Sequence, residues 1–408
     1  MYIKVKINNN ITMSYYLLPN IKNTIHHDDL DCKLGEPNVV ISKSFNNYLN
    51  NMKKQIDKYN LTWDCYKKYT NVYEYIHTVI PYTKFPVCKL RPLSRSFFKL
   101  IEIYNLLNID FNLENIKSFH LAEGPGGFIE AMTHLRNNSE DLYYGMTLIS
   151  DDDNVPSWKK SKHFLNKNPN VIIDSGKDGT GNLFSLENFE YIYDNYKNTM
   201  DFVTADGGFD FSVDFNQQEN LSLKLIFSQI IYALAIQKQG GHFVLKIFDI
   251  FTQGTLDLLY LLSISYEKIY IVKPFTSRTA NSEKYIFCKN YKLQNFDELY
   301  EKFKIFFIEL ESENSIQRFL NFDLPYLFIN KIEDINAIIG QQQLENILLT
   351  LGLLDNNKND KLDSIKKNNI QKSIQWCIKY KLPYNKNVQN YNIFIPNFED
   401  EKSNDVKN

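Results

Sequence analysis

Cysteine is scarce in this 408-residue chain, and its few occurrences are scattered. The five cysteines are Cys32, Cys65, Cys88, Cys288 and Cys377, an odd number with no CxxC spacing. Zinc sites and disulfide frameworks have regular cysteine patterns, so the sequence indicates neither of them. This usage favours a reducing compartment, and we expect a cytoplasmic protein that holds no metal.

Long apolar segments are also lacking. The first residues, MYIKVKINNNITMSYY, contain no apolar core of the kind that a signal peptide needs. No uninterrupted apolar run reaches the roughly 20 residues that span a bilayer. We therefore expect no membrane partner. The hydrophobic content of 43% and the charged content of 23% are those of a globular protein.

An overall positive charge is missing as well, because the formal net charge is −2. A polyanion such as RNA would then need a local basic patch. Residues 51–100 offer one, with ten basic and three acidic side chains interleaved with aromatic ones. This mixture suits a single strand, because phosphates need charge and bases need stacking faces. The alternative is a solvated helical face whose aromatic residues belong to the core.

The apolar pattern predicts an α/β domain over residues 82–292. Short apolar runs alternate there with helical periods, which is typical of a doubly wound sheet with helices on both faces. An N-terminal extension, residues 1–81, precedes it. A helical C-terminal region, residues 293–398, and a frayed tail, residues 399–408, follow it, and a polar linker is expected near 354–368. The runs that predict strands are 116–121, 142–148, 171–173, 201–205, 242–248, 268–272 and 284–288.

A glycine-rich turn, AEGPGGF at residues 122–128, lies between the first of these strands and a helix. Its glycines allow a tight turn and close approach of a ligand, whose polar end would meet the helix N-terminus. No Gly-Lys-Ser/Thr follows and the GxGxxG spacing is absent, which excludes a Walker loop and a nicotinamide-dinucleotide fingerprint. The alternative is a plain strand-to-helix turn.

Three charged residues stand at the edges of apolar strands. Asp206 ends a strand before two glycines, at the carboxyl edge where ligands bind in such sheets. Lys246 lies inside an apolar strand, where an ammonium is costly unless paired, and a neutral amine is a usable base. A polar loop between two strands delivers Glu283. The alternatives are a turn aspartate, a lysine that reaches solvent and an exposed hairpin loop.

Five segments in this order resemble the motifs of the FtsJ-like ribose 2′-O-methyltransferases. They are SRSFFK at 94–99, EGPGGF at 123–128, ADGGF at 205–209, GGHFVLK at 240–246 and SRTANSE at 277–283. The last segment, with GMTL at 145–148 and ENL at 219–221, is most similar to the eukaryotic and viral mRNA cap 2′-O-methyltransferases. The resemblance covers about half of the chain. It implies a Rossmann-like, seven-stranded sheet that binds S-adenosylmethionine.

The resemblance also implies a role for each matching residue. The family's Lys-Asp-Lys-Glu tetrad falls on Lys99, Asp206, Lys246 and Glu283. The implied cofactor-binding residues are Glu123, Gly124, Pro125, Gly126, Gly127, Phe128, Asn182, Leu183 and Asp206. At Asn182 an amide replaces the family's acidic residue, which keeps an acceptor for adenine but loses the charge. The implied substrate contacts are Ser94, Arg95, Asn220, Leu221, Ser222 and Asn281.

The implied reaction is methylation of the first transcribed nucleotide of capped mRNA at its ribose 2′-oxygen. Lys246 would accept the hydroxyl proton, while Asp206 and Glu283 hold the two ammonium groups. The alternatives are a ribosomal- or transfer-RNA 2′-O-methyltransferase and a catalytically inactive RNA-binding scaffold subunit. RNA is the expected partner, and the C-terminal helices are a candidate surface for a protein partner. Abundant Asn, Lys and Ile suggest a large DNA virus, with a viral factory or virion as the location.

Overall fold

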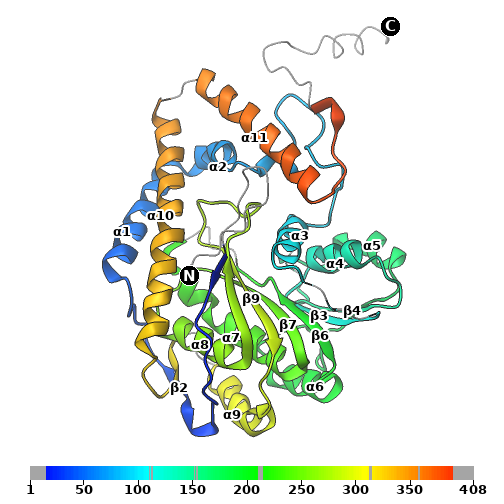
Figure 1. The fold of residues 1–408 in the computed structure, drawn as a ribbon, viewed down its shortest axis with the longest axis vertical. Coiled ribbons are helices and arrows are strands. Elements are labelled where there is room, and N and C mark those ends of the chain that lie inside the picture. Colours follow the sequence, from blue (N-terminus) through cyan, green and yellow to red (C-terminus); the bar gives the residue numbers. More distant parts are fainter. Residues whose placement is uncertain are drawn as a thin grey trace. The chain divides into compact units, whose positions relative to one another are not determined.

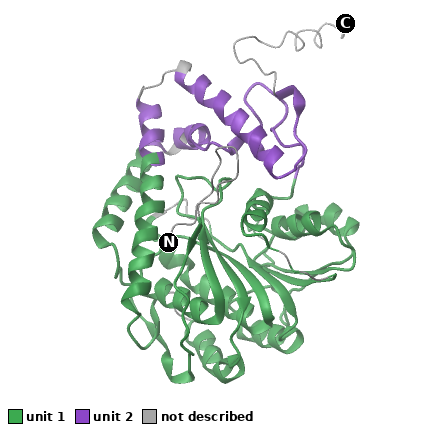
Figure 2. Cartoon of the chain, viewed as in Figure 1, with its two compact units in different colours: residues 1–58, 92–345 green, residues 59–91, 346–408 purple. Residues whose placement is uncertain are grey.

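In the computed structural model, the described residues are 15–388 except 110, 112–113, 151, 153–154, 210–214, 312–314 and 357–358. The expected tail at 399–408 lies outside them. The chain divides into two compact units, drawn in green and purple in Figure 2. Unit 1 comprises residues 1–58 and 92–345, and unit 2 comprises residues 59–91 and 346–408. Unit 2 therefore combines an early segment with the last segment of the chain, and the domain boundaries expected from the sequence stay predictions.

The centre of unit 1 is a mixed eight-stranded sheet with the order β1-β8-β9-β7-β6-β3-β4-β5 (Figure 1). The strands are β1 (Tyr15–Leu17), β3 (Lys117–Leu121), β4 (Leu142–Met146), β5 (Val171–Ile173), β6 (Met200–Ala205), β7 (Gln237–Ile247), β8 (Tyr266–Val272) and β9 (Lys284–Tyr291). Strands β3 to β7 are parallel, whereas β9 runs antiparallel to both β7 and β8. The expected α/β class is confirmed.

The sheet has one strand more than the seven expected. The extra strand β1 pairs antiparallel with the edge strand β8, with Tyr16 opposite Ile271. The rings of Tyr15 and Tyr270 pack edge to face with their centroids 5.4 Å apart. A three-residue strand is too short to show an alternating pattern, so the pairing of a distant segment decides it.

Helices flank the sheet in two groups. Helices α3 (Ser96–Leu106) and α4 (Gly127–Arg136) pack on each other, with the short α5 (Lys162–Lys167) following along the chain. The second group consists of α6 (Leu186–Tyr196), α7 (Gln218–Ile236), α8 (Gln253–Ser265) and α9 (Phe296–Glu309). By length and composition α7 could cross a membrane, the only such helix among the described residues, but 89% of its apolar window is buried inside the protein. Apolar residues on all sides are equally typical of a core helix.

Segments outside the central sheet complete unit 1. Helix α1 (Lys43–Lys54) packs on α10 (Tyr326–Asn356), where a side chain at Gly340 would collide with the Phe45 ring. A second, two-stranded sheet joins β2 (Leu30–Leu34) to β10 (Ile316–Leu320). The sequence did not predict this sheet, because its two strands are far apart in the chain.

A buried ion pair joins α1 to the end of β7. Lys53 Nζ lies 2.7 Å from Asp249 Oδ2, and Lys53 is only 4% exposed. Lys284 Nζ lies 3.9 Å from the other carboxylate oxygen. Burial by itself would raise the pKa of Asp249, but the two ammonium groups hold it below its usual value. The N-terminal region thus supplies a charge that the interior of unit 1 needs.

Unit 2 is built mainly from α2 (Asn60–Thr70) and α11 (Asn359–Lys379). Asn369 Nδ2 donates to the Tyr69 carbonyl at 2.7 Å, and Trp376 is fully buried. The polar linker expected at 354–368 is wrong, since most of that segment is helical. Ile370, Ile374 and Cys377 are buried at helical spacing, so a single apolar stripe suffices to dock a helix that is otherwise polar.

Candidate active site

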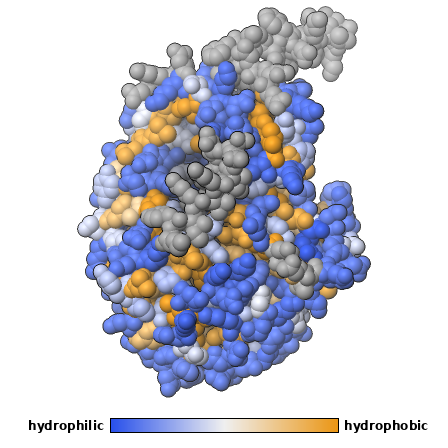
Figure 3. Space-filling model, viewed as in Figure 1, coloured by the Kyte–Doolittle hydropathy of each residue, from blue (hydrophilic) through white to orange (hydrophobic). Residues whose placement is uncertain are grey.

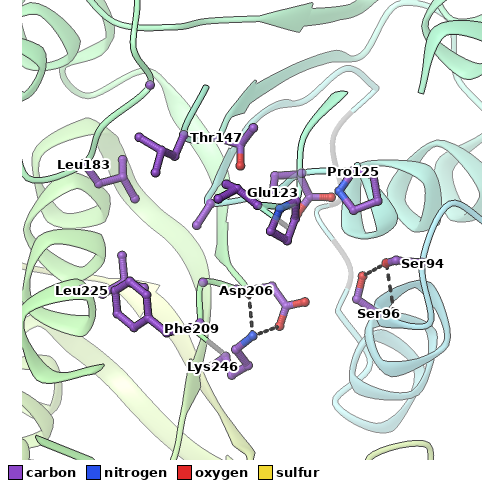
Figure 4. Close-up of a pocket in the computed structure, with 18 of the residues that line it drawn as sticks. Ser94, Ser96, Glu123, Pro125, Thr147, Leu183, Asp206, Phe209, Leu225 and Lys246 are labelled. Atoms are coloured by element: carbon purple, nitrogen blue, oxygen red, sulfur yellow. Dashed lines mark hydrogen bonds and ion pairs between the residues drawn. The ribbon is translucent and has the colours of Figure 1, made fainter. Parts of the chain in front are cut away.

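A cavity of about 740 Å³ opens in unit 1 where the parallel strands end. Glu123, Gly124 and Pro125 line it after β3, and Thr147 and Leu148 line it after β4. Residues 206–209 after β6 line it on another side, and Figure 4 shows Asp206, Phe209 and Leu225 around it. The carboxyl edge of a parallel sheet is the usual position of a ligand site, which the glycine-rich turn and Asp206 predicted.

The side chain of Glu123 caps the N-terminus of α4. Glu123 Oε1 accepts hydrogen bonds from the backbone N–H groups of Phe128 (2.7 Å) and Ile129 (3.0 Å). Burial raises the pKa of Glu123 to about 8. Two N–H groups of the first turn of α4 are therefore occupied by the protein itself. The expectation that a ligand's polar end meets this helix N-terminus stays a prediction.

The glycine-rich turn divides into two halves. Gly124 and Pro125 line the cavity, whereas Gly126, Gly127 and Phe128 are not among the lining residues. A side chain at Gly127 would collide with the hydroxyls of Ser94 and Ser96, and Phe128 is fully buried. Close packing of α4 against the start of α3 therefore accounts for Gly127. A cofactor role for these last three residues stays a prediction.

The opposite wall is a loop that lies against the end of β4. Gly181 has a φ of 65°, and a side chain there would collide with the Thr147 carbonyl oxygen. The loop is held by hydrogen bonds from Ile149 N to Thr180 O and from Gly181 N to Ser175 O, both 2.7 Å long. Asn182 and Leu183 follow and line the cavity, as predicted for cofactor contacts. Asn182 Oδ1 accepts from Phe184 N at 3.0 Å, and a second lone pair remains for a ligand.

The four residues of the expected tetrad meet on one side of this cavity. Lys99 comes from α3, Asp206 from the end of β6, Lys246 from β7 and Glu283 from the loop before β9. Lys99 Nζ lies 2.8 Å from Glu283 Oε2. Lys246 Nζ lies 2.6 Å from the Asp206 carbonyl oxygen and 3.3 Å from its Oδ1, the two dashed contacts in Figure 4. Two acids and two amines thus share one wall.

A fifth residue, Tyr285, connects the two halves of the tetrad. Its hydroxyl donates to Asp206 Oδ1 at 2.7 Å and accepts from Lys99 Nζ at 3.1 Å. The ring is fully buried, and burial raises the pKa of the phenol well above its usual value, so the hydroxyl keeps its proton. Tyr285 was not predicted from the sequence. A signal existed, because Glu283 and Tyr285 are two residues apart and side chains alternate along a strand.

Burial and charge act in opposite directions on the tetrad. Burial lowers the pKa of Lys99, and the carboxylates of Glu283 and Asp206 oppose that shift only in part. Burial alone would raise the pKa of Glu283, but the ammonium groups of Lys99, Lys246 and Lys273 hold it well below its usual value. Glu283 is therefore a carboxylate, fixed between cations.

Lys273 is the second site residue that was not predicted from the sequence. Its Nζ donates to the Asn281 carbonyl (2.7 Å), to Asn281 Oδ1 (2.7 Å) and to the Glu283 carbonyl (2.6 Å). Burial lowers the pKa of Lys273 to about 7. Ser277 Oγ donates to Glu283 Oε1 at 2.7 Å. Lys273 and Ser277 thereby hold the loop that carries Glu283, and only the folded loop reveals their function.

The predicted substrate contacts are not brought together. Ser94 and Arg95 line the cavity, and Arg95 Nη2 donates to the Thr276 carbonyl at 2.8 Å. Asn220, Leu221, Ser222 and Asn281 are not among the lining residues. Ser222 is buried and donates to the Gln218 carbonyl at 2.6 Å, while Lys273 holds Asn281. Gln218, one helical turn before Ser222, is the residue of α7 that does reach the cavity with Leu225.

The basic stretch at 51–100 does not form one surface. Lys53 is buried against Asp249, and Lys99 belongs to the tetrad. Lys67, Lys68, Lys84, Lys89 and Arg91 belong to unit 2. Lys53 and Lys99 are therefore not available to an RNA backbone, and the binding of RNA by the other basic residues of this stretch stays a prediction. Among the described residues, no group of three or more His, Cys, Asp or Glu side chains is arranged to hold a metal.

Comparison with known proteins identifies the fold that carries this site. The family model described as FtsJ-like methyltransferase matches residues 92–291, which contain all four tetrad residues and the cavity. Residues 92–291 are an FtsJ-like methyltransferase domain. The resemblance found in the sequence is thereby confirmed.

The names of similar curated proteins are more specific than the description of the family. The cap-specific mRNA (nucleoside-2′-O-)-methyltransferase 1 of Mus musculus is 33% identical over 225 residues, which are 53% of this chain and 26% of that protein. The corresponding enzyme 2 of Drosophila melanogaster is 29% identical over 242 residues, 53% of this chain and 33% of that protein. This chain thus spans a quarter to a third of these relatives. A solved ribosomal RNA methyltransferase from Plasmodium falciparum is 20% identical with a TM-score of 0.37, over 50% of this chain and 100% of that one.

Such methyltransferases use S-adenosylmethionine, and the cavity of this domain fits it. Side chains at Gly124 and Gly181 would collide with the Pro156 and Thr147 carbonyl groups, so both glycines keep the cavity walls close and narrow. Leu183 and Leu225 offer apolar contacts for a flat ring, and Asp206 of the tetrad offers a carboxylate. Asn182 offers an amide oxygen for an amino group. Apolar walls with a few placed polar groups are typical of a cofactor site.

Proposed function

We propose that this chain is an S-adenosylmethionine-dependent RNA ribose 2′-O-methyltransferase that methylates the first transcribed nucleotide of capped mRNA. The observation that carries the proposal is the cluster of Lys99, Asp206, Lys246 and Glu283 on the wall of the cavity. The names of the relatives, which describe cap-specific mRNA nucleoside-2′-O-methyltransferases, support both the reaction and the substrate.

The chemical task is to place a ribose hydroxyl against an electrophile and remove its proton. Bound S-adenosylmethionine supplies an activated methyl group. Positioning of the two reactants contributes much of the rate, because it converts a bimolecular step into one within a complex. The hydroxyl proton also needs an acceptor, and a positioned base contributes roughly 10²–10⁴-fold.

Lys99 and Lys246 both line the cavity, and Lys246 has the fewer protein partners. A side chain at Gly208, an exposed residue of the cavity wall, would lie 3.1 Å from Lys246 Nζ. The hydrogen-bond partners of Lys246 Nζ among the described residues are the two Asp206 oxygens, and proton acceptance requires its neutral amine, whose lone pair takes the hydroxyl proton. Lys99 instead bonds both Glu283 and Tyr285. We therefore assign proton acceptance to Lys246, and we assign orientation of the cluster to Lys99, Glu283 and Asp206.

The charge of unit 1 favours a short substrate end over a long duplex. Unit 1 contains 31 basic and 39 acidic residues, a net charge of −8. An enzyme that embraces folded ribosomal or transfer RNA is expected to present a broad positive surface. A capped 5′ end needs only the local cluster of amines at the cavity.

The test offers capped and triphosphate-ended RNA of one sequence at equal concentration, with mass spectrometry to locate the methyl group. We expect the capped RNA to be methylated at the first nucleotide at least about tenfold faster, about 1.4 kcal/mol in the barrier. Equal rates or internal methylation would support the ribosomal- or transfer-RNA alternative. Cofactor binding without transfer to any RNA would support the inactive scaffold.

A further inference from the structure

Positive charge is concentrated in unit 2. Its two segments, residues 59–91 and 346–408, contain 15 basic and 9 acidic residues, whereas unit 1 is net negative. Attraction of a nucleic acid follows local rather than total charge, since screening limits it to about 8 Å at physiological salt. The exposed cations of unit 2 are therefore the charges that an RNA chain placed on this unit would meet.

Unit 2 also presents aromatic residues to solvent from a closed turn. Tyr82 is 88% exposed and Phe85 is 53% exposed. The turn is fixed by hydrogen bonds from Ile80 N to Phe85 O (3.3 Å) and from Thr83 N to Ile80 O (3.0 Å). The Thr83 hydroxyl lies 2.9 Å from both of these carbonyl oxygens. Figure 3 shows apolar patches among the hydrophilic surface of this unit, drawn in purple in Figure 2.

The backbone and surroundings of Tyr82 are unusual for a surface tyrosine. Its φ is 65°, a left-handed conformation that is uncommon and strained for bulky residues. Lys366 Nζ lies over the ring, 5.3 Å from its centre, and Lys366 itself is only 4% exposed. A buried cation thus supports a ring that otherwise faces water. Strain of this kind persists where a function depends on the position of the side chain.

We propose that unit 2 binds single-stranded RNA, with bases stacked on Tyr82 and Phe85 and phosphates paired with Lys84, Lys89 and Arg91. The three cations are exposed and lie within six residues of Phe85. Aromatic faces beside cations are the combination that single strands require, whereas a protein partner would need no excess of positive charge. The proposal rests on the proposed function in taking RNA as the substrate.

The experiment measures binding of a fluorescently labelled, uncapped 12-nucleotide RNA to the full chain, without cofactor. Tyr82→Asn removes the ring and suits the left-handed backbone, because asparagine tolerates it better than other residues. It is combined with Phe85→Ala. The matched control is Tyr326→Ala, which removes a tyrosine that is 78% exposed in unit 1. A ribose-phosphate chain of equal length without bases is the second ligand.

We expect the double variant to bind the RNA at least about fivefold more weakly and the base-free chain equally well. Tyr82→Phe and Tyr326→Ala should bind both ligands as the wild type does. Unchanged RNA affinity in the double variant would overturn the proposal and favour a protein partner. An equal loss on both ligands would also overturn it. Because no capped end or methyl transfer is measured, failure of the proposed function would leave this result standing.

The cations are tested by salt dependence. Replacement of Lys84, Lys89 and Arg91 by glutamine should flatten the slope of log Kd against log salt by about 0.7 for each phosphate that the variant no longer neutralises. Lys268→Gln, an exposed lysine of unit 1, serves as the control. Identical slopes in the wild type and the triple variant would remove these three residues from the binding surface.

Discussion

Lys246 and Tyr285 are direct partners across strands β7 and β9, and both side chains end on Asp206 Oδ1. Tyr285 donates to this oxygen at 2.7 Å, and Lys246 lies 3.3 Å from it. The register of two antiparallel strands therefore sets the position of the amine to which we assign proton acceptance. A shift of either strand by one residue would turn its side chain to the other face of the sheet and separate the pair.

Replacement of Lys246 by methionine should abolish methyl transfer, with a loss of at least roughly 10²-fold, because the proton acceptor is removed. Methionine keeps an unbranched side chain in the strand, so the fold should persist. S-adenosylmethionine affinity, measured by calorimetry, should stay within about twofold, since Lys246 acts on the substrate hydroxyl. Lys268→Met, at an exposed position of β8, is the control. Near-normal turnover of Lys246→Met would show that the base is another residue.

Replacement of Tyr285 by phenylalanine should slow transfer about tenfold or more without loss of cofactor binding. The change removes only the hydroxyl that links Lys99 to Asp206, and a hydrogen bond to a charged group is worth about 1.5–3 kcal/mol. The control is Tyr266→Phe, which removes another buried tyrosine hydroxyl, one bonded to Gln237. Both variants should lose stability in thermal unfolding, but only Tyr285→Phe should lose turnover. Equal turnover in the two would assign Tyr285 to packing alone.

Alanine at Gly181 should weaken S-adenosylmethionine binding at least about tenfold, or 1.4 kcal/mol. The new side chain would collide with the Thr147 carbonyl and push the cavity wall outward. Gly179→Ala is a close control, because Gly179 lies in the same loop with a φ of 74° and nothing within 4 Å. The two variants share the backbone strain and differ in the collision. If both lose affinity equally, loop strain rather than wall position is the cause.

The lowered pKa of Lys273 predicts that the stability of the protein depends on pH. Its pKa is lowered from 10.5 to about 7, so between these values the unfolded chain binds more protons than the folded one. The penalty is complete below pH 7 and is relieved as pH rises toward 10.5. The wild type should therefore gain stability over Lys273→Met with rising pH, by at most about 1.4 kcal/mol per pH unit.

Urea unfolding at pH 6 and pH 9 measures this difference. Lys273→Met also leaves the carbonyls of Asn281 and Glu283 without their donor, which should cost about 1–3 kcal/mol. Lys268→Met should run parallel to the wild type across the same range. A constant gap between the wild type and Lys273→Met would mean that Lys273 titrates alike in the folded and unfolded chain.

The sequence predicted those site residues that belong to a recognisable motif and also stand in or after an apolar strand. Asp206 and Lys246 stand in or after apolar strands, and their motifs occur in a fixed order, so both were identified. Tyr285 and Lys273 carry no motif of their own, and their roles depend on which strands and loops meet. Ser222 lay in a matching segment, yet its hydroxyl bonds its own helix, a choice that local sequence does not decide.

The elements of the fold were likewise predicted in part. The central strands were predicted because each carries enough alternating or apolar residues to be recognised. Strand β1 and the β2–β10 sheet depend on partners more than 200 residues away, and unit 2 joins the early segment 59–91 to the end of the chain. Long-range pairing leaves little trace in a local pattern. Only the first half of α11 was mistaken for a linker, because that part of the helix is largely polar.

The Lys53–Asp249 pair shows that the part of the chain shared with relatives depends on residues outside it. Sequence similarity to the family begins at residue 92, but Lys53 and β1 lie before it. A truncated protein that starts at residue 92 would bury Asp249 without its closest cation and leave β8 as an open edge. Removing one partner of a buried pair costs about 3–5 kcal/mol, a large part of the roughly 5–15 kcal/mol that stabilises a domain. The domain shared with relatives is thus smaller than the part of the chain that we expect to fold stably, and removal of the residues before 92 should destabilise it.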